Sequence, residues 1–147
     1  MKLRRLVEKI DFSLVCGDLD LEISDIFYDS RKCIKNSVFV CLKGYNEDGH
    51  GFIDSAIANG AVAVVISDDV SIEGEITVVK VEDTREALAF MSAEFFENPA
   101  SQLKTVAITG TKGKTTVSCM IRTVLQKAGI KTGVIGTLGV IIGDKNG

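Results

Sequence analysis

No stretch of this sequence is long and apolar enough to cross a lipid bilayer. The longest weakly polar stretch, residues 132–143, is broken by four glycines, whereas a membrane-spanning helix needs about 20 apolar residues. The basic start at residues 1–7 is followed by Glu8, Lys9 and Asp11, which interrupt an export signal before its apolar centre could form. The sequence therefore predicts a cytoplasmic protein without a membrane span.

Excess positive charge and closely spaced cysteines are also lacking. Lys and Arg number 17 against 20 Asp and Glu, a net charge of −3, so the chain has no basic footprint for a nucleic acid or an anionic membrane. The cysteines Cys16, Cys33, Cys41 and Cys119 show no spacing typical of a zinc or redox motif, and we expect buried, reduced thiols.

The only proline, Pro99, marks the predicted boundary between two domains. Before it, Thr84 is expected to cap a helix that ends near Glu97, with charged residues such as Glu94 pointing outward. Upstream, residues 38–42, 61–66 and 76–81 are β-branched runs typical of strands buried on both faces. A helix over residues 52–59, stopped by Gly60, completes a small α/β domain.

After the boundary, residues 104–109 are expected to form a buried strand, residues 115–128 a helix and residues 131–136 a second strand. This order predicts one βαβ unit with a glycine-rich turn after its first strand. Residues 138–142 begin a further strand. Because two or three strands cannot bury both faces of such a sheet, this domain looks cut off.

Residues 109–116, with the sequence TGTKGKTT, match the phosphate-loop pattern G-x-x-G-K-T. Glycines let backbone N–H groups turn toward phosphate oxygens, and a helix start adds positive potential. The pattern predicts that Lys114 contacts the β- and γ-phosphates of ATP and that the Thr115 hydroxyl binds Mg²⁺. The longer form of the pattern has a glycine where this chain has Ile108, so only the shorter form matches.

In this shorter form the loop resembles the ATP loop of the Mur ligase family. The upstream half agrees independently, because residues 29–31 (DSR), 38–44 (VFVCLKG), 48–53 (DGHGFI) and 56–61 are similar to that family's uridine-binding N-terminal domain, in the same order. The resemblance implies an α/β fold with a UDP-substrate-binding domain at residues 1–101. Residues 102–147 would then be the first βαβ unit of a P-loop ATP-binding domain.

The resemblance also implies the site residues. Ser30 would contact the UDP substrate, and Tyr45, Asn46 and Glu47 occupy the position of the uracil-contacting loop. Lys114 would be catalytic, Thr115 would bind the metal, and the ATP-binding set is Gly110, Thr111, Lys112, Gly113, Lys114, Thr115 and Thr116. His50, the only histidine, is expected to make a structural hydrogen bond, since no nucleophile stands at motif distance.

The activity implied by the resemblance is an ATP-dependent ligase of peptidoglycan precursor synthesis, with Mg²⁺. It would add a diamino acid, L-lysine or meso-diaminopimelate, to UDP-N-acetylmuramoyl-L-alanyl-D-glutamate through an acyl phosphate. We expect the chain to be an incomplete fragment and inactive alone. The alternatives are a uridine-nucleotide-binding module without catalysis and a ligase that adds a different amino acid. The sequence leaves the oligomeric state open.

Overall fold

The computed structural model describes residues 1–45, 47–72, 74–143 and 145–146. It divides into two compact units, Met1–Leu103 and Lys104–Gly147, and each is considered by itself. The α/β class predicted from the sequence is confirmed.

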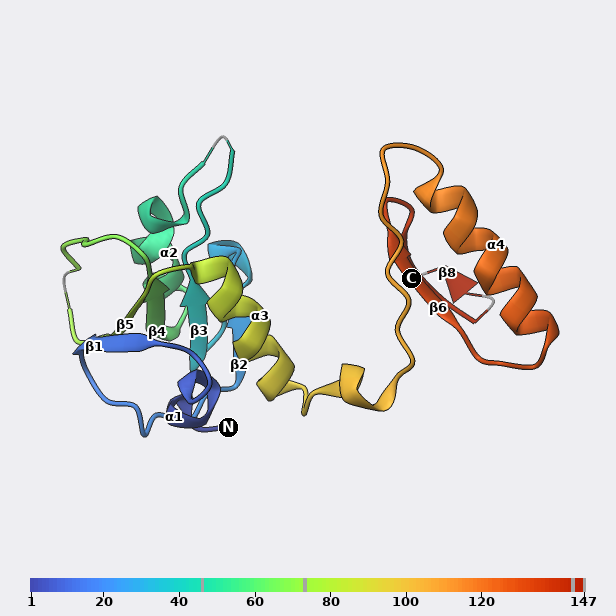
Figure 1. Ribbon diagram of the computed structural model, residues 1–147. Coiled ribbons are helices and arrows are strands. Elements are labelled where there is room, and N and C mark those ends of the chain that lie inside the picture. The colour runs from blue at the N-terminus through green and yellow to red at the C-terminus, as the bar shows by residue number, and fades with distance from the viewer. Residues whose placement is uncertain (46, 73, 144, 147) are drawn as a thin grey trace. The chain divides into compact units, whose positions relative to one another are not determined.

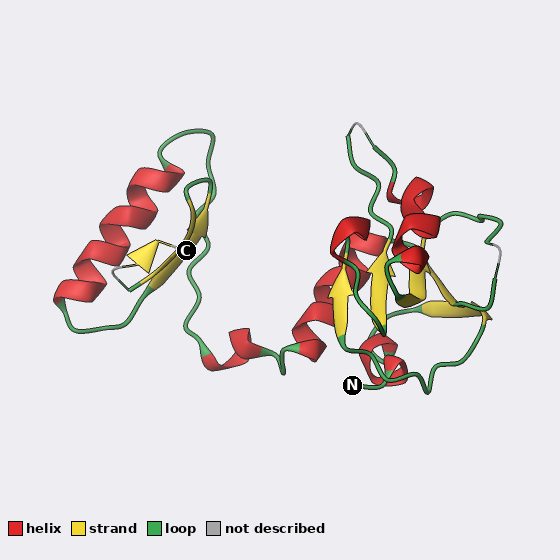
Figure 2. Ribbon diagram, turned by 180° about the vertical axis from the view of Figure 1, so that it is seen from behind, coloured by secondary structure: helices red, strands yellow, loops and turns green. Residues whose placement is uncertain are grey.

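The first unit is built on a five-stranded sheet in the order β1-β5-β4-β3-β2 (Figures 1 and 2). Its strands are β1 (Phe12–Cys16), β2 (Asp25–Phe27), β3 (Ser37–Val40), β4 (Ala61–Ile66) and β5 (Thr77–Val81). Strands β2 to β5 run parallel, each beside the next in the chain, and β1 pairs antiparallel with β5. All four carboxyl ends of the parallel strands therefore meet at one edge.

Helices cover both faces of this sheet. On one face, α1 (Leu3–Val7) and α3 (Thr84–Phe95) pack Leu6 and Met91 against Val40 and its neighbours. On the other face, α2 (Ile53–Ala58) packs Ala56 against Phe39 and its neighbours. Successive residues of a strand point to opposite faces, which is why a run without polar residues is needed here. Each fully buried aliphatic side chain contributes about 1.5–3 kcal/mol.

The three central strands and the two longer helices of this unit confirm the sequence predictions, with small shifts at their ends. The elements α1, β1 and β2 were not predicted, because they are only three to five residues long and carry little periodicity. The helix cap was assigned wrongly to Thr84. Asp83 caps α3, its Oδ1 accepting from the amides of Arg85 at 2.7 Å and Glu86 at 3.2 Å.

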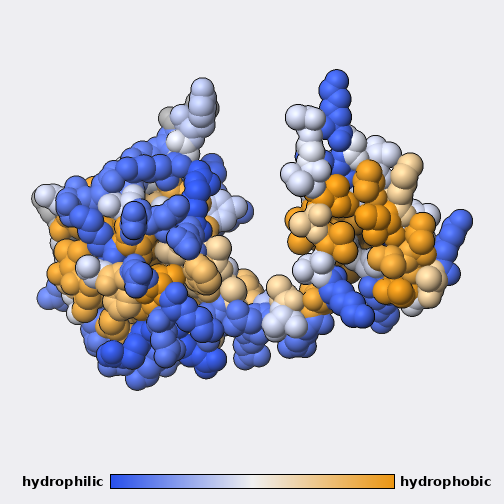
Figure 3. All heavy atoms as spheres, viewed as in Figure 1, coloured by the Kyte–Doolittle hydropathy of each residue, from blue (hydrophilic) through white to orange (hydrophobic). Residues whose placement is uncertain are grey.

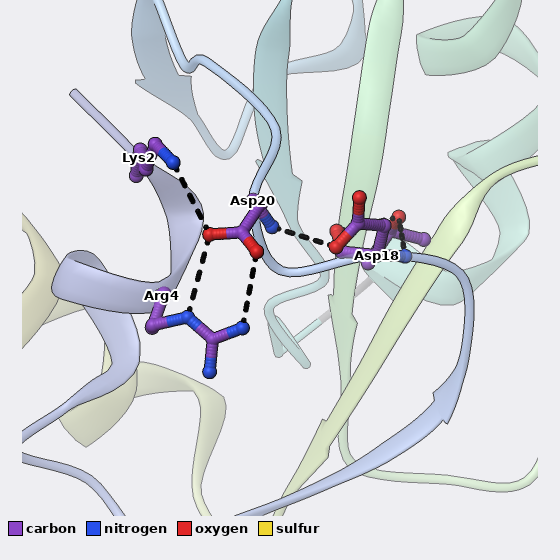
Figure 4. Close-up of polar contacts among 5 residues, drawn as sticks. Lys2, Arg4, Asp18 and Asp20 are labelled. Atoms are coloured by element: carbon purple, nitrogen blue, oxygen red, sulfur yellow. Dashed lines mark hydrogen bonds and ion pairs between the residues drawn. The ribbon is translucent and has the colours of Figure 1, made fainter.

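The first helix is held in place by polar contacts at both of its ends. At its start, Asp20 lies between Lys2 and Arg4, with Oδ2 3.3 Å from Arg4 Nη2 and Oδ1 3.3 Å from Lys2 Nζ (Figure 4). Near its end, Glu94 of α3 accepts from Arg5 Nε at 3.0 Å and from Lys9 Nζ at 2.7 Å. The prediction that Glu94 points outward is therefore wrong, and its carboxylate joins two helices far apart in sequence.

The second unit contains α4 (Lys114–Lys127) and a three-stranded sheet of β6 (Gly133–Gly136), β7 (Gly139–Ile142) and β8 (Lys145–Asn146). The strands of this sheet are antiparallel. Arg122 and Gln126 of α4 both donate to the Gly143 carbonyl and fasten the helix to the sheet. The 3-10 turn Pro99–Gln102 precedes this unit in the chain.

The strand predicted at residues 104–109 is not formed, so of the expected βαβ unit the described residues contain the helix and the following strand. A β-branched sequence favours extended backbone, but a strand also needs a hydrogen-bonded neighbour, and no described strand pairs with these residues. Large apolar side chains of the unit are exposed, including Met120, Val124 and Ile135 at 61%, 67% and 85%. Hydrophobic residues, drawn in orange, cover much of the face of this unit that Figure 3 shows.

The cysteines were only partly as expected. All four thiols are free, but Cys16 is exposed and Cys119 half-buried, whereas Cys33 and Cys41 are buried as predicted. Burial raises the pKa of the Cys41 thiol to about 12, which keeps it protonated and inert. Among the residues described, no helix has the length and apolarity that a bilayer crossing requires.

The contacts of Glu94 with Arg5 and Lys9 predict that the folded chain loses stability as the pH falls. Hydrogen bonds from Lys9 and then Arg5 lower the pKa of Glu94 from 4.5 to about 2. A carboxylate whose pKa is depressed by folding stabilises the fold above its unfolded pKa and loses that contribution as the pH falls toward the folded pKa. Glu94→Gln should therefore unfold at lower urea than the unchanged chain at pH 7, and the difference should shrink between about pH 4.5 and 2.

Glu97→Gln is the matched control, because Glu97 is exposed and only three residues away. Urea titrations at pH 7, 4 and 3 measure the effect. A constant difference between Glu94→Gln and the unchanged chain over this range would contradict the assignment.

Candidate functional site

The carboxyl ends of β2, β3, β4 and β5 place four loops along one edge of the first unit's sheet. In open sheets of this kind, ligands bind outside the carboxyl ends of the strands. The loop after β2 contains Ser30, and the loop after β3 is a hairpin whose stem residues are Lys43 and Asp48. The loop after β4 begins at Ser67, and α3 follows β5 directly. This edge is the candidate site of the first unit.

The turn after β2 presents Ser30 in a fixed geometry. The Asp29 carboxylate accepts from the Arg31 amide at 3.1 Å and from Arg31 Nε and Nη2 at 2.9 Å each. The side-chain hydrogen bonds from Arg31 hold the pKa of Asp29 below its usual range, although desolvation acts in the opposite direction. The Asp29–Arg31 pair therefore fixes the conformation of this turn.

Ser30 itself is 6% exposed and begins the short 3-10 helix η1 (Ser30–Lys32). Its carbonyl accepts from Asn59 Nδ2 at 3.0 Å, which ties the turn to the end of α2. Within the described part of the chain, no hydrogen bond involves the Ser30 hydroxyl, and it is not among the fully buried polar atoms, so it can turn toward a ligand.

The hairpin after β3 is closed by backbone hydrogen bonds. Gly44 donates to the Glu47 carbonyl at 2.8 Å, and Gly49 donates to the Leu42 carbonyl at 2.9 Å. Tyr45 is fully exposed, so it does not cover the loop, and Glu47 is exposed as well. Asn46, the third residue predicted in this loop, lies outside the described residues.

The Ser30 turn and the hairpin lie within electrostatic reach of each other. The pKa of Arg31 is raised chiefly by its hydrogen bond to Asp29, and the negative charge of Glu47 adds to the shift. The two segments predicted to contact a uridine nucleotide thus follow neighbouring strands, β2 and β3.

His50 makes the structural hydrogen bonds that the sequence predicted. Its Nδ1 lies 2.6 Å from Asp48 Oδ1, and its Nε2 accepts from the amides of Ser67 at 3.1 Å and Asp68 at 3.4 Å. The ligand atoms of Asp48, His50 and Asp68 lie within 4.8 Å of one another. They do not suit a metal ion, because both ring nitrogens are engaged and the Lys43 ammonium already pairs with Asp68 at 2.6 Å.

Beside the hairpin lies an open depression of about 660 Å³ at the carboxyl ends of β4 and β5. Its lining is strongly polar and consists of Lys43, Ser67, Asp68, Glu82, Asp83, Thr84, Arg85 and Glu86. Sequence reasoning missed these residues, and Ser30 is not among them. The available signal was their position directly after β-branched runs, which places them at the same sheet edge as the hairpin.

The phosphate-loop residues of the second unit lie in the turn before α4. Gly110 and Gly113 have φ of +147° and +81°, and Gly113 starts α4 without a capping side chain. The positive φ at Gly113 favours glycine, and the uncapped helix start leaves its first amides free for an anion. Lys114 Nζ donates to the Gly110 carbonyl at 2.5 Å, so the lysine folds back over its own loop.

The seven residues predicted to bind ATP are thus brought together in one exposed segment, Gly110 to Thr116. The Thr115 hydroxyl that is predicted to bind Mg²⁺ lies in the first turn of α4, next to Lys114. Within the described part of this unit, no other segment combines a glycine turn, a helix start without a capping side chain and a lysine beside it.

Two family models match the chain. The model described as "Mur ligase family, catalytic domain" matches residues 22–96, and "Mur ligase middle domain" matches residues 108–147. A UDP-N-acetylmuramoyl-L-alanyl-D-glutamate–2,6-diaminopimelate ligase of Clostridium perfringens is 45% identical over 145 residues, which cover 99% of this chain and 30% of the relative. The chain therefore spans less than a third of the length of the curated relatives it matches.

Solved structures of similar proteins agree on the fold. UDP-N-acetylmuramoylalanyl-D-glutamyl-2,6-diaminopimelate–D-alanyl-D-alanyl ligase from Acinetobacter baumannii is 31% identical with a TM-score of 0.66, covering 86% of this chain and 28% of its own. A MurF ligase from Thermotoga maritima in complex with ADP is 29% identical with a TM-score of 0.53, covering 74% of this chain and 24% of its own.

The hairpin geometry predicts that Gly49 tolerates no side chain. A Cβ at this position would lie 2.6 Å from the Leu42 amide nitrogen and 2.9 Å from the Leu42 carbonyl oxygen, both backbone atoms. Gly49→Ala should destabilise the chain by about 1–3 kcal/mol, as overpacking does elsewhere. Gly51→Ala is the matched control, since its Cβ would meet nothing within 4 Å. Urea unfolding of both variants measures the difference, and equal midpoints would refute the close approach.

Proposed function

Because the chain belongs to the Mur ligase family, we propose that it is the nucleotide-binding part of a ligase in peptidoglycan precursor synthesis. The reaction that we propose for a full-length ligase containing this chain is the ATP-dependent addition of diaminopimelate to UDP-N-acetylmuramoyl-L-alanyl-D-glutamate. The 45% identity to a ligase of that name over 99% of this chain supports this choice over the addition of lysine. Localisation in the cytoplasm is part of the same proposal.

We propose that residues 1–101 bind the UDP end of the substrate at the carboxyl edge of the sheet. The observation that carries this proposal is the free hydroxyl of Ser30 in a rigid turn beside the hairpin. A hydroxyl can donate to a uracil or pyrophosphate oxygen without burying a charge. The exposed ring of Tyr45 offers a surface on which a base can stack, with Asn46 and Glu47 as its proposed neighbours.

We propose that residues 102–147 begin the part that binds ATP and Mg²⁺. The free amides at the start of α4 and the left-handed Gly113 fit a phosphate group, and Lys114 supplies a cation at the same place. The Gly110 carbonyl that now accepts from Lys114 would release it to a phosphate oxygen, which is the stronger acceptor because it is charged. When bound, ATP would supply the phosphoryl group that activates the substrate carboxylate, and Mg²⁺ would neutralise charge on the phosphates.

Loss of the Ser30 hydroxyl should weaken UDP binding. A hydrogen bond to a charged group contributes about 1.5–3 kcal/mol, so Ser30→Ala should raise the dissociation constant for UDP about tenfold or more. Ser13→Ala is the control. Ser13 is exposed on β1, the outermost strand on the side of the sheet away from β2 and the Ser30 turn. Calorimetric titration with UDP decides, and equal affinities for both variants would remove Ser30 from the site.

Loss of the Lys114 ammonium should slow turnover more than it weakens ATP binding. Charge on the transferred phosphoryl group is stabilised most in the transition state, so Lys114→Ala should lower the rate of ADP release by the full-length ligase at least a hundredfold. Lys127→Ala, at the exposed end of the same helix, is the control. A coupled ADP assay with the UDP-linked dipeptide and diaminopimelate measures both, and unchanged turnover would exclude the loop from catalysis.

A further inference from the structure

Both stem residues of the hairpin after β3 are fastened to segments from elsewhere in the sequence. Asp48 is held through His50, and Lys43 is held through Asp68 and Arg85. These contacts come from the loop after β4 and from the first turn of α3. The hairpin therefore takes its place from side-chain contacts as well as from its own backbone.

His50 bridges two chain segments through both of its ring nitrogens. Because Nε2 accepts from the amides of Ser67 and Asp68, it carries no proton, and the proton of the neutral ring must lie on Nδ1. Nδ1 then donates to Asp48 Oδ1 at 2.6 Å, the same oxygen that accepts from the His50 amide at 2.9 Å. The ring thus joins the outgoing stem of the hairpin to the end of β4.

The burial of the ring shows that this bridge is built into the fold. The His50 side chain is 6% exposed, whereas the Asp48 side chain that it holds is 51% exposed. A buried polar ring whose hydrogen bonds are all made has a defined orientation, since any rotation would leave a buried nitrogen without a partner. His50 can therefore transmit the position of residues 67–68 to the hairpin.

The other stem is held at the same place. Lys43 Nζ lies 2.7 Å from Asp68 Oδ1, and Arg85 Nη2 donates to the Lys43 carbonyl at 2.7 Å. Asp68 thus contacts both stems, because its amide donates to His50 and its carboxylate pairs with Lys43. Asp69, the next residue, faces away from this network and pairs with Lys80 at 2.6 Å.

We propose that His50 is a positioning residue for nucleotide recognition: by bridging Asp48 to the amides of Ser67 and Asp68, it holds the hairpin at the sheet edge that also carries the Ser30 turn. This rests on the proposed function, because it assumes that the hairpin and Ser30 contact a uridine nucleotide. His50 acts through the hairpin and does not itself contact the nucleotide. Its removal should change both the affinity for UDP and the order of the hairpin.

The test measures these two quantities separately in the 147-residue chain. Calorimetry gives the dissociation constant for UDP, and amide hydrogen exchange at Gly44 and Gly49 reports whether the hairpin is closed. His50→Ala should weaken UDP binding about tenfold or more and lower the protection of both amides. His50→Gln keeps an acceptor for the amides of Ser67 and Asp68 and should restore part of both, which also covers the case that His50→Ala does not fold.

Asp68→Asn and Asp69→Asn form the matched pair for the Lys43 stem. Asp68→Asn weakens the contact to Lys43 and should lower the affinity for UDP and the exchange protection of the Gly44 amide. Asp69→Asn, whose partner is Lys80, should leave the affinity and the protection unchanged. Folded His50 variants with unchanged UDP affinity and unchanged protection would overturn the proposal. Weaker UDP binding with unchanged protection would also overturn it, since His50 would then act by direct contact.

Failure of the proposed function would give a different result. An unchanged chain that does not bind UDP, although its His50→Ala variant loses protection at Gly44 and Gly49, would refute uridine-nucleotide binding by this edge. The positioning of the hairpin by His50 would stand in that case. Binding of UDP by the unchanged chain together with an unprotected hairpin would refute the positioning role alone.

Discussion

The parallel sheet of the first unit persists only if both of its faces are kept from water. Strands β3 and β4 are buried along nearly their whole length, so α1 and α3 must cover one face and α2 the other. With both faces occupied by helices, the edge at the carboxyl ends of the strands is where loops of variable sequence can reach a ligand. The location of the candidate site follows from this covering of the sheet.

Polar side chains then fix the loops that the sheet brings together. The Asp29–Arg31 fork rigidifies one turn, and His50, Lys43 and Asp68 secure the hairpin next to it. The phosphate loop of the second unit is organised differently, because it depends on the backbone conformation of Gly113 and on the start of α4. A loop that offers its own backbone amides needs less support from distant side chains than a loop that offers side chains.

Much of this fold could be predicted from local patterns, and two of the misses share one cause. The strand at residues 61–66 and the loop before α4 are defined by short-range signals and lie where the sequence placed them. Residues 104–109 have equally strong strand propensity but form no strand, because pairing requires a neighbour that local sequence does not specify. Glu94 was misjudged for the same reason, since its partners Arg5 and Lys9 are 89 and 85 residues away.

Local sequence was enough to predict the α/β class, the buried strands of the first unit, the glycine-rich turn before α4 and the choice of Lys114 for testing. These features depend on periodicity, glycine placement and short motifs, which act over a few residues. The contacts of Glu94 with Arg5 and Lys9, and the bridge from His50 to the amides after β4, depend instead on the tertiary structure. Such hydrogen bonds form between the particular groups that the order of strands and the packing of helices bring within about 3 Å, and no local pattern encodes that proximity.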